Sequence, residues 1–261
     1  MIYTHNIHPV MVSIGSIDLY WYGAMYAISF LLIDYMMKRE IVINTEYKFS
    51  SSFIDHLVFL SIISIILGGR LGYVLFYNFE FYSSNPLKIL FIWEGGMSFH
   101  GALIGICISL FILSINNQIK FFKLTDFLVI FIPIGLFLGR IGNFINSELF
   151  GAPTYSNWGV IFPRVDSIPR HPSMLYEALL EGILLFVILL FIKKNKPDTG
   201  VLTSSFLLFY AFFRFCVEFV RVPDSHIGYL YSDWLTMGMI LSVPMFFVGI
   251  LIYYYSKKGK I

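Results

Sequence analysis

Residues 53–77 read FIDHLVFLSIISIILGGRLGYVLFY, and after His56 the only charged side chain in this run is that of Arg70. An α-helix rises about 1.5 Å per residue, so roughly 20 apolar residues are enough to cross the hydrocarbon core of a bilayer. The run therefore predicts a transmembrane helix.

The same pattern recurs along the chain and gives seven apolar runs of sufficient length. We expect an all-α, polytopic integral membrane protein of about seven transmembrane helices, over residues 17–37, 53–77, 97–115, 121–141, 174–192, 201–220 and 233–255. The fourth helix is expected to kink or end early, because it contains or borders on Pro133, Gly135, Gly139 and Gly142.

The composition supports a bilayer environment. Apolar residues make up 57% of the 261 positions and charged residues only 13%, a balance that is unusual for a water-soluble domain. No hydrophilic stretch is long enough to bury a second core, so residues 1–261 are expected to form a single transmembrane domain. The net charge of +2 comes with short, dispersed basic clusters, which do not indicate nucleic-acid binding. Cys107 and Cys216 lie in apolar runs and are expected to be packing residues.

Lysine and arginine predict the orientation, because cytoplasmic loops carry the excess of both. With the N-terminus outside and the C-terminus in the cytoplasm, the inner side receives eleven of the eighteen basic residues: Lys38, Arg39, Lys48, Lys120, Lys123, Lys193, Lys194, Lys196, Lys257, Lys258 and Lys260. All four tryptophans then fall near the outer interface, which indoles prefer. The first residues lack the basic start and cleavage site of a signal peptide, so the first run is expected to remain as a span.

Several ionisable side chains fall in the outer halves of these predicted helices: Tyr26, His100, Arg140, Glu177, Glu181 and Arg214. Such a group costs at least about 2.5 kcal/mol in a membrane, so it is retained mainly beside a cavity or a partner. The two glutamates need cationic partners, for which arginines of other helices are candidates. Arg70, in the run GGRLG, is expected to serve close helix packing instead.

Tyr210, Arg214, Glu218 and Arg221 are spaced by four, four and three residues, so they share one helical face. This face is expected to point into the helix bundle. The Arg214–Glu218 spacing fits a self-satisfying ion pair as well as a functional role, and the spacing alone leaves both readings open.

Residues 139–151, GRIGNFINSELFG, bring several polar side chains to the predicted membrane boundary and form the most informative stretch of the sequence. Arg140, Asn143, Asn146 and Glu148 stand among glycines that let the backbone turn or approach a ligand closely. This set suits an anionic lipid headgroup. The segment 95–105, GGMSFHGALIG, similarly places His100 beside glycine, where its ring can reach a substrate.

The motifs of several membrane enzymes are absent from the sequence. It contains neither HExxH nor GxSxG, and no histidine, cysteine and carboxylate cluster at metal-ligand spacing, so neither a metal nor another cofactor is implied. Arginines that neutralise a phosphodiester and a histidine that accepts a proton suit group transfer from a phospholipid. A transporter or flippase, or a non-enzymatic assembly factor, are the competing classes.

Five segments resemble those of bacterial prolipoprotein diacylglyceryl transferases: WYGAMY at 21–26, GGMSFHGALIG at 95–105, GRIGNFINSELFG at 139–151, RHPSMLYE at 170–177 and YAFFRFCVEF at 210–219. The resemblance covers essentially the whole chain. It implies a seven-span enzyme of the bacterial inner membrane with its N-terminus and active site toward the outer face. It also implies a reaction, in which the diacylglyceryl group of phosphatidylglycerol moves to the thiol of the lipobox cysteine in a prolipoprotein signal peptide, and glycerol phosphate is released.

The resemblance also implies roles for individual residues. Arg140 corresponds to an arginine that binds phosphatidylglycerol, and His100 to an essential residue that either deprotonates or orients the substrate thiol. Arg140 and Arg214 are expected to hold the phosphate, and Tyr26 is a further catalytic candidate. The expected substrate-binding residues are Arg140, Asn143, Asn146, Glu148, Gly151, Tyr210 and Glu218. Ser147, Phe150 and Ala102 depart from the usual Gly, Trp and Gly, without affecting the proposed catalytic groups.

Overall fold

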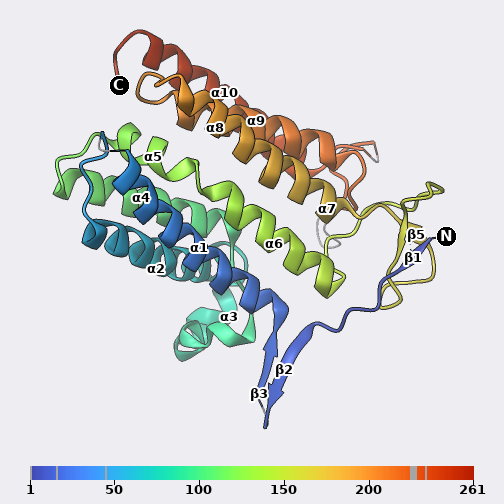
Figure 1. Ribbon diagram of the computed structural model, residues 1–261. Helices are drawn as coiled ribbons and strands as arrows, with labels where there is room; N and C mark the ends of the chain where they lie inside the picture. The colour runs from blue at the N-terminus through green and yellow to red at the C-terminus, as the bar shows by residue number, and fades with distance from the viewer. Residues whose placement is uncertain (1, 16, 45, 224–227, 233) are drawn as a thin grey trace. The chain divides into compact units, whose positions relative to one another are not determined.

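A computed structural model describes residues 2–15, 17–44, 46–223, 228–232 and 234–261. The chain divides into two compact units, which we call the first unit (Met1–Ile33 with Asp126–Ile261) and the second unit (Asp34–Thr125). Figure 1 shows that both consist mainly of helices. That the whole chain acts as a single domain stays a prediction.

Four helical stretches are long and apolar enough to cross a membrane: Ser51–Phe76, Ser173–Lys194, Val201–Glu218 and Met237–Lys257. These are α2, the continuous stretch of α7 (Ser173–Glu177), η3 (Ala178–Leu184) and α8 (Leu185–Lys194), then α9 and α10. A fifth span results if α5 (Phe121–Val129) and α6 (Ile132–Asn146), which are bent by 43°, count as one. The chain is therefore a polytopic, mostly helical membrane protein.

The two other predicted spans also form helices, α1 (Trp21–Ile43) and α4 (Phe99–Asn116). The count of seven spans and the orientation of the termini stay predictions. The kink expected in the fourth span is confirmed at the α5–α6 break, but the helix continues past residue 141 to Asn146. The predicted start of the seventh span, Asp233, lies outside the described residues, and α10 begins at Met237.

The predicted start of the first span at residue 17 is wrong. Residues Ile17–Tyr20 form strand β3, which pairs antiparallel with β2 (Val10–Ile14), and α1 begins only at Trp21. Gly15, with φ +64°, makes the tight turn between the strands, and the Ser13 hydroxyl donates to Asp18 Oδ1 at 2.6 Å. Both the strand and the helix are apolar here, so hydropathy alone does not locate the boundary between them.

A small three-stranded sheet joins the N-terminal segment to the part of the chain that follows α6. Strand β1 (Tyr3–Thr4) pairs parallel with β4 (Val160–Ile161), which pairs antiparallel with β5 (Pro169–Arg170). Beneath it Val160, Phe162 and Met174 form a buried apolar cluster, on which Phe144 of α6 packs. The sheet thus fixes the end of α6, where the polar segment 139–151 begins.

In the first unit, α9 packs on α10 and on α8, as Figure 1 shows, and α6 packs on the η3 segment. The start of α9 is fixed by Asp126 of α5, which is buried. Its carboxylate accepts hydrogen bonds from the backbone N–H of Gly200 at 2.5 Å and of Thr203 at 2.7 Å. These donors have no partner within the first turn of a helix, so an acid there both caps it and opposes its dipole.

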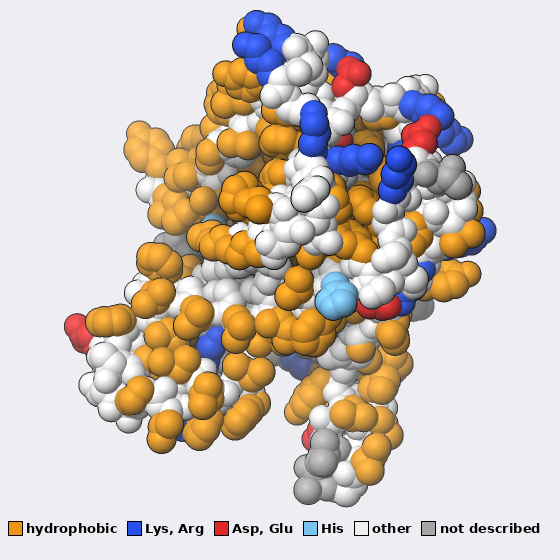
Figure 2. Space-filling view, turned by 90° about the vertical axis from the view of Figure 1, so that its left-hand side faces the viewer, with side chains coloured by type: hydrophobic (Ala, Val, Ile, Leu, Met, Phe, Trp, Pro, Cys, Tyr) orange, Lys and Arg blue, Asp and Glu red, His pale blue; other side chains and the backbone are white. Residues whose placement is uncertain are grey.

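In the second unit, α2 and α4 pack against each other through glycines. A Cβ on Gly101 would lie 2.8 Å from the Cα of Gly72, and a Cβ on Gly105 2.5 Å from the carbonyl oxygen of Ser64, so only glycine allows this approach. The packing role expected for the GGRLG run is confirmed. Figure 2 shows hydrophobic side chains over much of the face in view, as expected for a protein that contacts lipid.

Arg70 of the same run is buried and binds backbone carbonyls rather than an acid. Its guanidinium donates to the carbonyls of Lys88, Ile89, Phe91, Gly95 and Gly96. This ties α2 to the connection that contains α3 (Phe79–Ser84), η1 (Pro86–Leu90) and η2 (Ile92–Glu94). The same connection leads directly into α4 and His100.

Candidate active site

Three arginines from separate segments of the first unit converge on one carboxylate. Glu177 Oε2 lies 2.6 Å from Arg140 Nε of α6 and 3.0 Å from Arg214 Nη1 of α9, and its Oε1 lies 3.3 Å from Arg221 Nη1. The Glu177 side chain is fully buried. A charge removed from water in this way is tolerated only when it is paired, and here three guanidinium groups pair with it.

Two further carboxylates complete the group, which we call the arginine cluster: Arg140, Glu177, Glu181, Arg214, Glu218 and Arg221. Glu181 is also fully buried and lies 3.6 Å from Arg140 Nη2 and 4.0 Å from Arg214 Nη1, whereas Glu218 Oε1 lies 2.5 Å from Arg214 Nη2. The three positive and three negative charges balance. The arginine partners expected for Glu177 and Glu181 are confirmed. Arg214 and Glu218 form the ion pair that their spacing allows, but Arg214 also pairs with Glu177.

Local helix geometry explains how the cluster assembles. Residues Ala178–Leu184 form a π-helical segment, a rare conformation that is frequent at functional sites. Glu177 immediately precedes this segment and Glu181 lies within it. A Cβ on Gly182 would lie 2.7 Å from Phe137 Cβ, so the segment packs tightly on α6 less than one turn before Arg140.

The arginines differ from the carboxylates in exposure. The side chains of Arg140 and Arg214 keep 17% and 15% of their surface accessible, while Glu177 and Glu181 have none. Arg140 uses Nε and Nη2 toward the glutamates, and among the described residues no partner is found for its Nη1. The buried acids therefore fix both guanidinium groups, and Nη1 of Arg140 remains as a donor for an anionic ligand.

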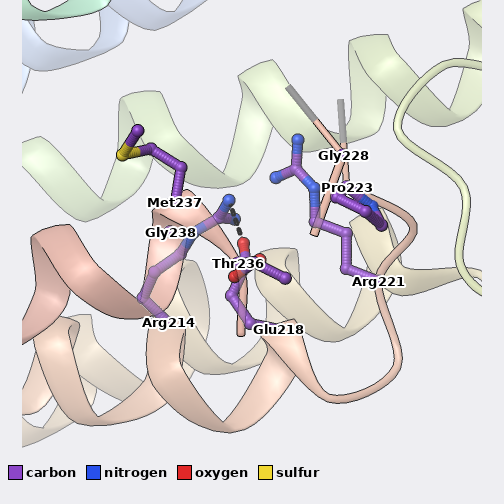
Figure 3. A pocket seen from close by; sticks show the side chains of 8 residues that line it. All are labelled: Arg214, Glu218, Arg221, Pro223, Gly228, Thr236, Met237 and Gly238. Atoms are coloured by element: carbon purple, nitrogen blue, oxygen red, sulfur yellow. Dashed lines mark hydrogen bonds and ion pairs between the residues drawn. The ribbon is translucent and has the colours of Figure 1, made fainter. Parts of the chain in front are cut away.

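A small pocket of about 40 Å³ adjoins the cluster, and Figure 3 shows Arg214, Glu218 and Arg221 pointing into it. Thr236, the residue before α10, donates its hydroxyl proton to Glu218 Oε2 at 2.5 Å and accepts from the Met239 backbone N–H at 3.2 Å. Thr236 thus caps α10 and fixes Glu218 at once. A Cβ on the neighbouring Gly238 would collide with the Glu218 carboxylate.

A second polar network follows Arg140 along the chain. Glu148 accepts hydrogen bonds from Asn143 Nδ2 at 3.3 Å and from Asn146 Nδ2 at 3.2 Å. On α1 the hydroxyls of Tyr22 and Tyr26 lie 3.0 Å apart, and the Tyr22 ring packs on Gly142, where a Cβ would lie 2.9 Å from it. The segment 139–151 thus forms a polar surface on α6 that adjoins the start of α1.

The remaining predicted site residues have distinct surroundings. Gly151 is buried, donates its backbone N–H to His171 O at 2.8 Å and pairs with Arg221, so it joins the chain after α9 to the segment 139–151. Tyr210 stacks on Phe206 one turn earlier on α9, at a ring distance of 5.8 Å. His100 lies in the first turn of α4 in the second unit, with an exposed side chain. Its approach to the arginine cluster stays a prediction.

Two contributors were not expected from the sequence. Thr236 and Tyr22 were not among the predicted site residues, although a threonine directly before an apolar helix is a recognisable N-cap and its position could have indicated a cap. That this cap also binds Glu218 depends on the packing of α10 on α9, which no local pattern reveals.

Comparison with known proteins identifies the family. The family model described as prolipoprotein diacylglyceryl transferase matches residues 9–255. The chain belongs to this family. Among its relatives in the family, the phosphatidylglycerol–prolipoprotein diacylglyceryl transferase of Methylococcus capsulatus is 46% identical over 246 residues, covering 94% of both chains. The enzymes of the same name from Pseudomonas aeruginosa, 46% identical over 97% of this chain and 95% of the relative, and from Nitratidesulfovibrio vulgaris, 44% identical over 94% and 93%, are similar.

Proposed function

We propose that this chain transfers the diacylglyceryl group of phosphatidylglycerol to the thiol of the lipobox cysteine in a prolipoprotein. A carbon–sulfur bond forms at the phosphate-bearing carbon of the diacylated glycerol. The bond between this carbon and the phosphate oxygen breaks, and the headgroup leaves as glycerol phosphate. Membership of the transferase family over residues 9–255 supports the activity. The structural observation that carries the proposal is the pair Arg140 and Arg214, held by buried acids with part of each side chain still accessible.

Arg140 and Arg214 bind the phosphate of phosphatidylglycerol and stabilise the negative charge that develops on it as the bond breaks. Fixed donors are most effective where charge develops, because they need not reorganise during the reaction. Glu177, Glu181 and Glu218 act through these arginines by holding their orientation. A guanidinium suits this task better than an ammonium group, since one of its edges pairs with the acids while another faces the phosphate.

His100 acts on the thiol, either by accepting its proton or by orienting it. A cysteine thiol has an unperturbed pKa of about 8.5, so it is mainly protonated at neutral pH and attack is faster once the proton is removed. The exposed ring at the start of α4 supports access from outside the helix. Cys107 and Cys216 have no role as nucleophiles in this scheme.

The other predicted residues line the lipid-binding surface. Asn143, Asn146 and Glu148 bind the headgroup or the glycerol hydroxyls, and Tyr26 and Tyr210 orient the substrate. Gly151 serves the surface indirectly, because a side chain there would collide with the Val220 carbonyl and the His171 side chain. The surface opens toward the outer leaflet of the bacterial inner membrane, with the N-terminus outside, and this orientation is supported by the lysine and arginine distribution.

The test is direct product detection. The detergent-solubilised protein is incubated with phosphatidylglycerol and a peptide containing a lipobox, and the peptide is analysed by mass spectrometry for the diacylglyceryl thioether. A peptide with serine in place of the lipobox cysteine is the matched control. A folded protein that yields no thioether contradicts the proposal and leaves a transporter or an assembly factor as the function.

A further inference from the structure

A second pocket, of about 530 Å³, lies within the second unit and shares no residue with the arginine cluster. It is formed where the connection between α1 and α2 meets the connection between α4 and α5. The lining includes Lys48 from the first connection and Phe53 from the start of α2, together with Ile119 and Lys120 from the second connection and Lys123 from the start of α5. Both connections are on the side that the lysine distribution predicts to be cytoplasmic.

The pocket is cationic without a built-in counter-charge. Lys48, Lys120 and Lys123 all line it and are exposed, and no acidic residue is part of the lining. None of the three ammonium groups forms an ion pair with a residue of the described part of the chain. Lys38, in the same unit, contrasts with them, because it lies 2.9 Å from Asp34 and 2.5 Å from Asp55. The free cations of the pocket therefore favour an anionic ligand.

The start of α2 adds to this positive potential. Ser50 lines the pocket and caps the helix by accepting a hydrogen bond from the Phe53 backbone N–H at 3.1 Å. The N-terminus of this helix, which is 26 residues long, therefore opens at the pocket. Helix N-termini favour phosphate because their dipole and free N–H groups carry partial positive charge.

The apolar part of the lining indicates a ligand with a hydrocarbon portion. Phe49, Phe53 and Ile119 are part of the lining, and the rings of the two phenylalanines stack at 4.9 Å. Just before the pocket, α4 exposes Ile112 and Ile115, so an outward apolar surface leads up to it. A free phosphate ion would use only the lysines, whereas a lipid would use both surfaces.

We infer that this pocket binds the phosphate headgroup of an anionic phospholipid of the cytoplasmic leaflet, with the acyl chains along the exposed face of α4. Basic pockets between helices at this membrane depth suit lipid headgroups. The inference does not depend on the proposed transfer reaction, because the pocket contains none of the residues assigned to it. The site anchors the second unit to the leaflet opposite to the one from which substrate is drawn.

Native mass spectrometry of the purified full-length protein with added dioctanoyl phosphatidic acid tests the inference. The variant with Lys48, Lys120 and Lys123 all changed to Gln should retain one lipid fewer, with an affinity for that site reduced about a hundredfold. The matched control changes Lys194, Lys258 and Lys260 to Gln, which removes the same charge from the same predicted face. A variant with Arg at the three pocket positions should bind as the native protein does.

The outcomes separate this inference from others. Equal lipid retention by the Gln variant and its control, or equal retention of dioctanoyl phosphatidylcholine at the site, would overturn it. Displacement of the lipid by millimolar inorganic phosphate would also overturn it, by assigning the site to a soluble phosphate. Transfer of diacylglyceryl to a lipobox peptide should be unchanged in the Gln variant, so a failed transferase assay of the native protein contradicts only the proposed function.

Discussion

Glu177 has no accessible surface and faces Arg140, Arg214 and Arg221 at 2.6 to 3.3 Å. Burying a carboxylate is costly. The cost is offset if the acid fixes two guanidinium groups that must meet a phosphate in one geometry, because a donor that is already oriented does not reorganise in the transition state. The buried acids are therefore best understood as positioning residues for the arginines.

A positive charge at position 140 is not expected to be sufficient for transfer. In Arg140→Lys a single ammonium group can pair with Glu177 or face the phosphate, but it cannot do both as the guanidinium does. The rate of diacylglyceryl transfer should fall by about a hundredfold, as for the loss of one oriented donor. Thermal unfolding checks that the variant is folded, and Arg39→Lys provides the same exchange outside the cluster. Full activity of Arg140→Lys would contradict the proposal that one edge of the guanidinium pairs with the acids while another faces the phosphate.

Ser147 and His5 form a contact at the C-terminal end of α6. Ser147 caps α6 in the left-handed region, with φ +60°, where glycine is favoured. Its hydroxyl lies 3.2 Å from Nδ1 of His5, which is buried against the rings of Phe144 and Phe162. The hydrogen bond offsets part of the strain that the serine side chain introduces.

His5 makes stability depend on pH. Burial lowers the pKa of His5 below 6.5, and the nearby Arg164 lowers it further, so the folded chain favours the neutral ring. The unfolded chain takes up the proton first as the pH falls, so stability is complete above about pH 6.5 and is lost toward the lower folded pKa. The thermal midpoint should fall over this range, and His5→Gln should flatten the slope. His8→Gln, at an exposed histidine, should leave the slope unchanged, and an equal slope in both variants would exclude His5 as its origin.

The packing of α2 on α4 depends on the absence of a side chain at individual glycines. Gly101→Ala should destabilise the protein by about 1–3 kcal/mol, because its new methyl group meets the backbone of Gly68 and Gly72 and forces the helices apart. Chemical or thermal unfolding in detergent measures the change. Gly23→Ala on α1 is the matched control, since nothing lies within 4 Å of a Cβ there, and it should be neutral or slightly stabilising. Equal stability of the two variants would show that the glycine contact is dispensable.

The helices could largely be predicted from the sequence, because each apolar run is long and hydropathy reports burial in lipid directly. The predicted start of α1 was wrong since hydropathy does not distinguish a β-hairpin such as Val10–Tyr20 from the helix that follows it. The π-helical segment Ala178–Leu184 was not expected either. Its sequence, ALLEGIL, is that of an ordinary helix, whereas in the structure the segment packs against Phe137 and places Glu181 beside Arg140.

The site could be predicted as a set of residues but only partly as an arrangement. Helical spacing placed Arg214 and Glu218 on one face, and the need of buried acids for cations linked Glu177 to the arginines. Spacing also placed Arg221 on this helical face, but α9 ends at Glu218, so the contact of Arg221 with Glu177 and that of Thr236 with Glu218 do not follow from spacing. Both contacts join segments whose proximity depends on tertiary packing.

At the scale of the whole molecule, the orientation in the membrane is the prediction with the widest consequences. It determines from which leaflet the phospholipid substrate reaches the arginine cluster. Lysine and arginine are retained on the cytoplasmic side during insertion, and eleven of the eighteen fall on one set of loops. Tyr155 lies in the connection between α6 and α7, which is predicted to be outside, and is fully exposed. Lys260 follows α10 on the side predicted to be inside.

Cysteine accessibility in spheroplasts tests this orientation. Cys107→Ala with Cys216→Ala gives the background, which should remain fully active because neither thiol takes part in the proposed reaction. A membrane-impermeant maleimide should label Tyr155→Cys in intact spheroplasts and Lys260→Cys only after permeabilisation, since lipid separates the two compartments. Labelling of Lys260→Cys before permeabilisation would place the C-terminus outside and contradict the predicted orientation. The arginine cluster would then have to be approached from a different leaflet than the one proposed.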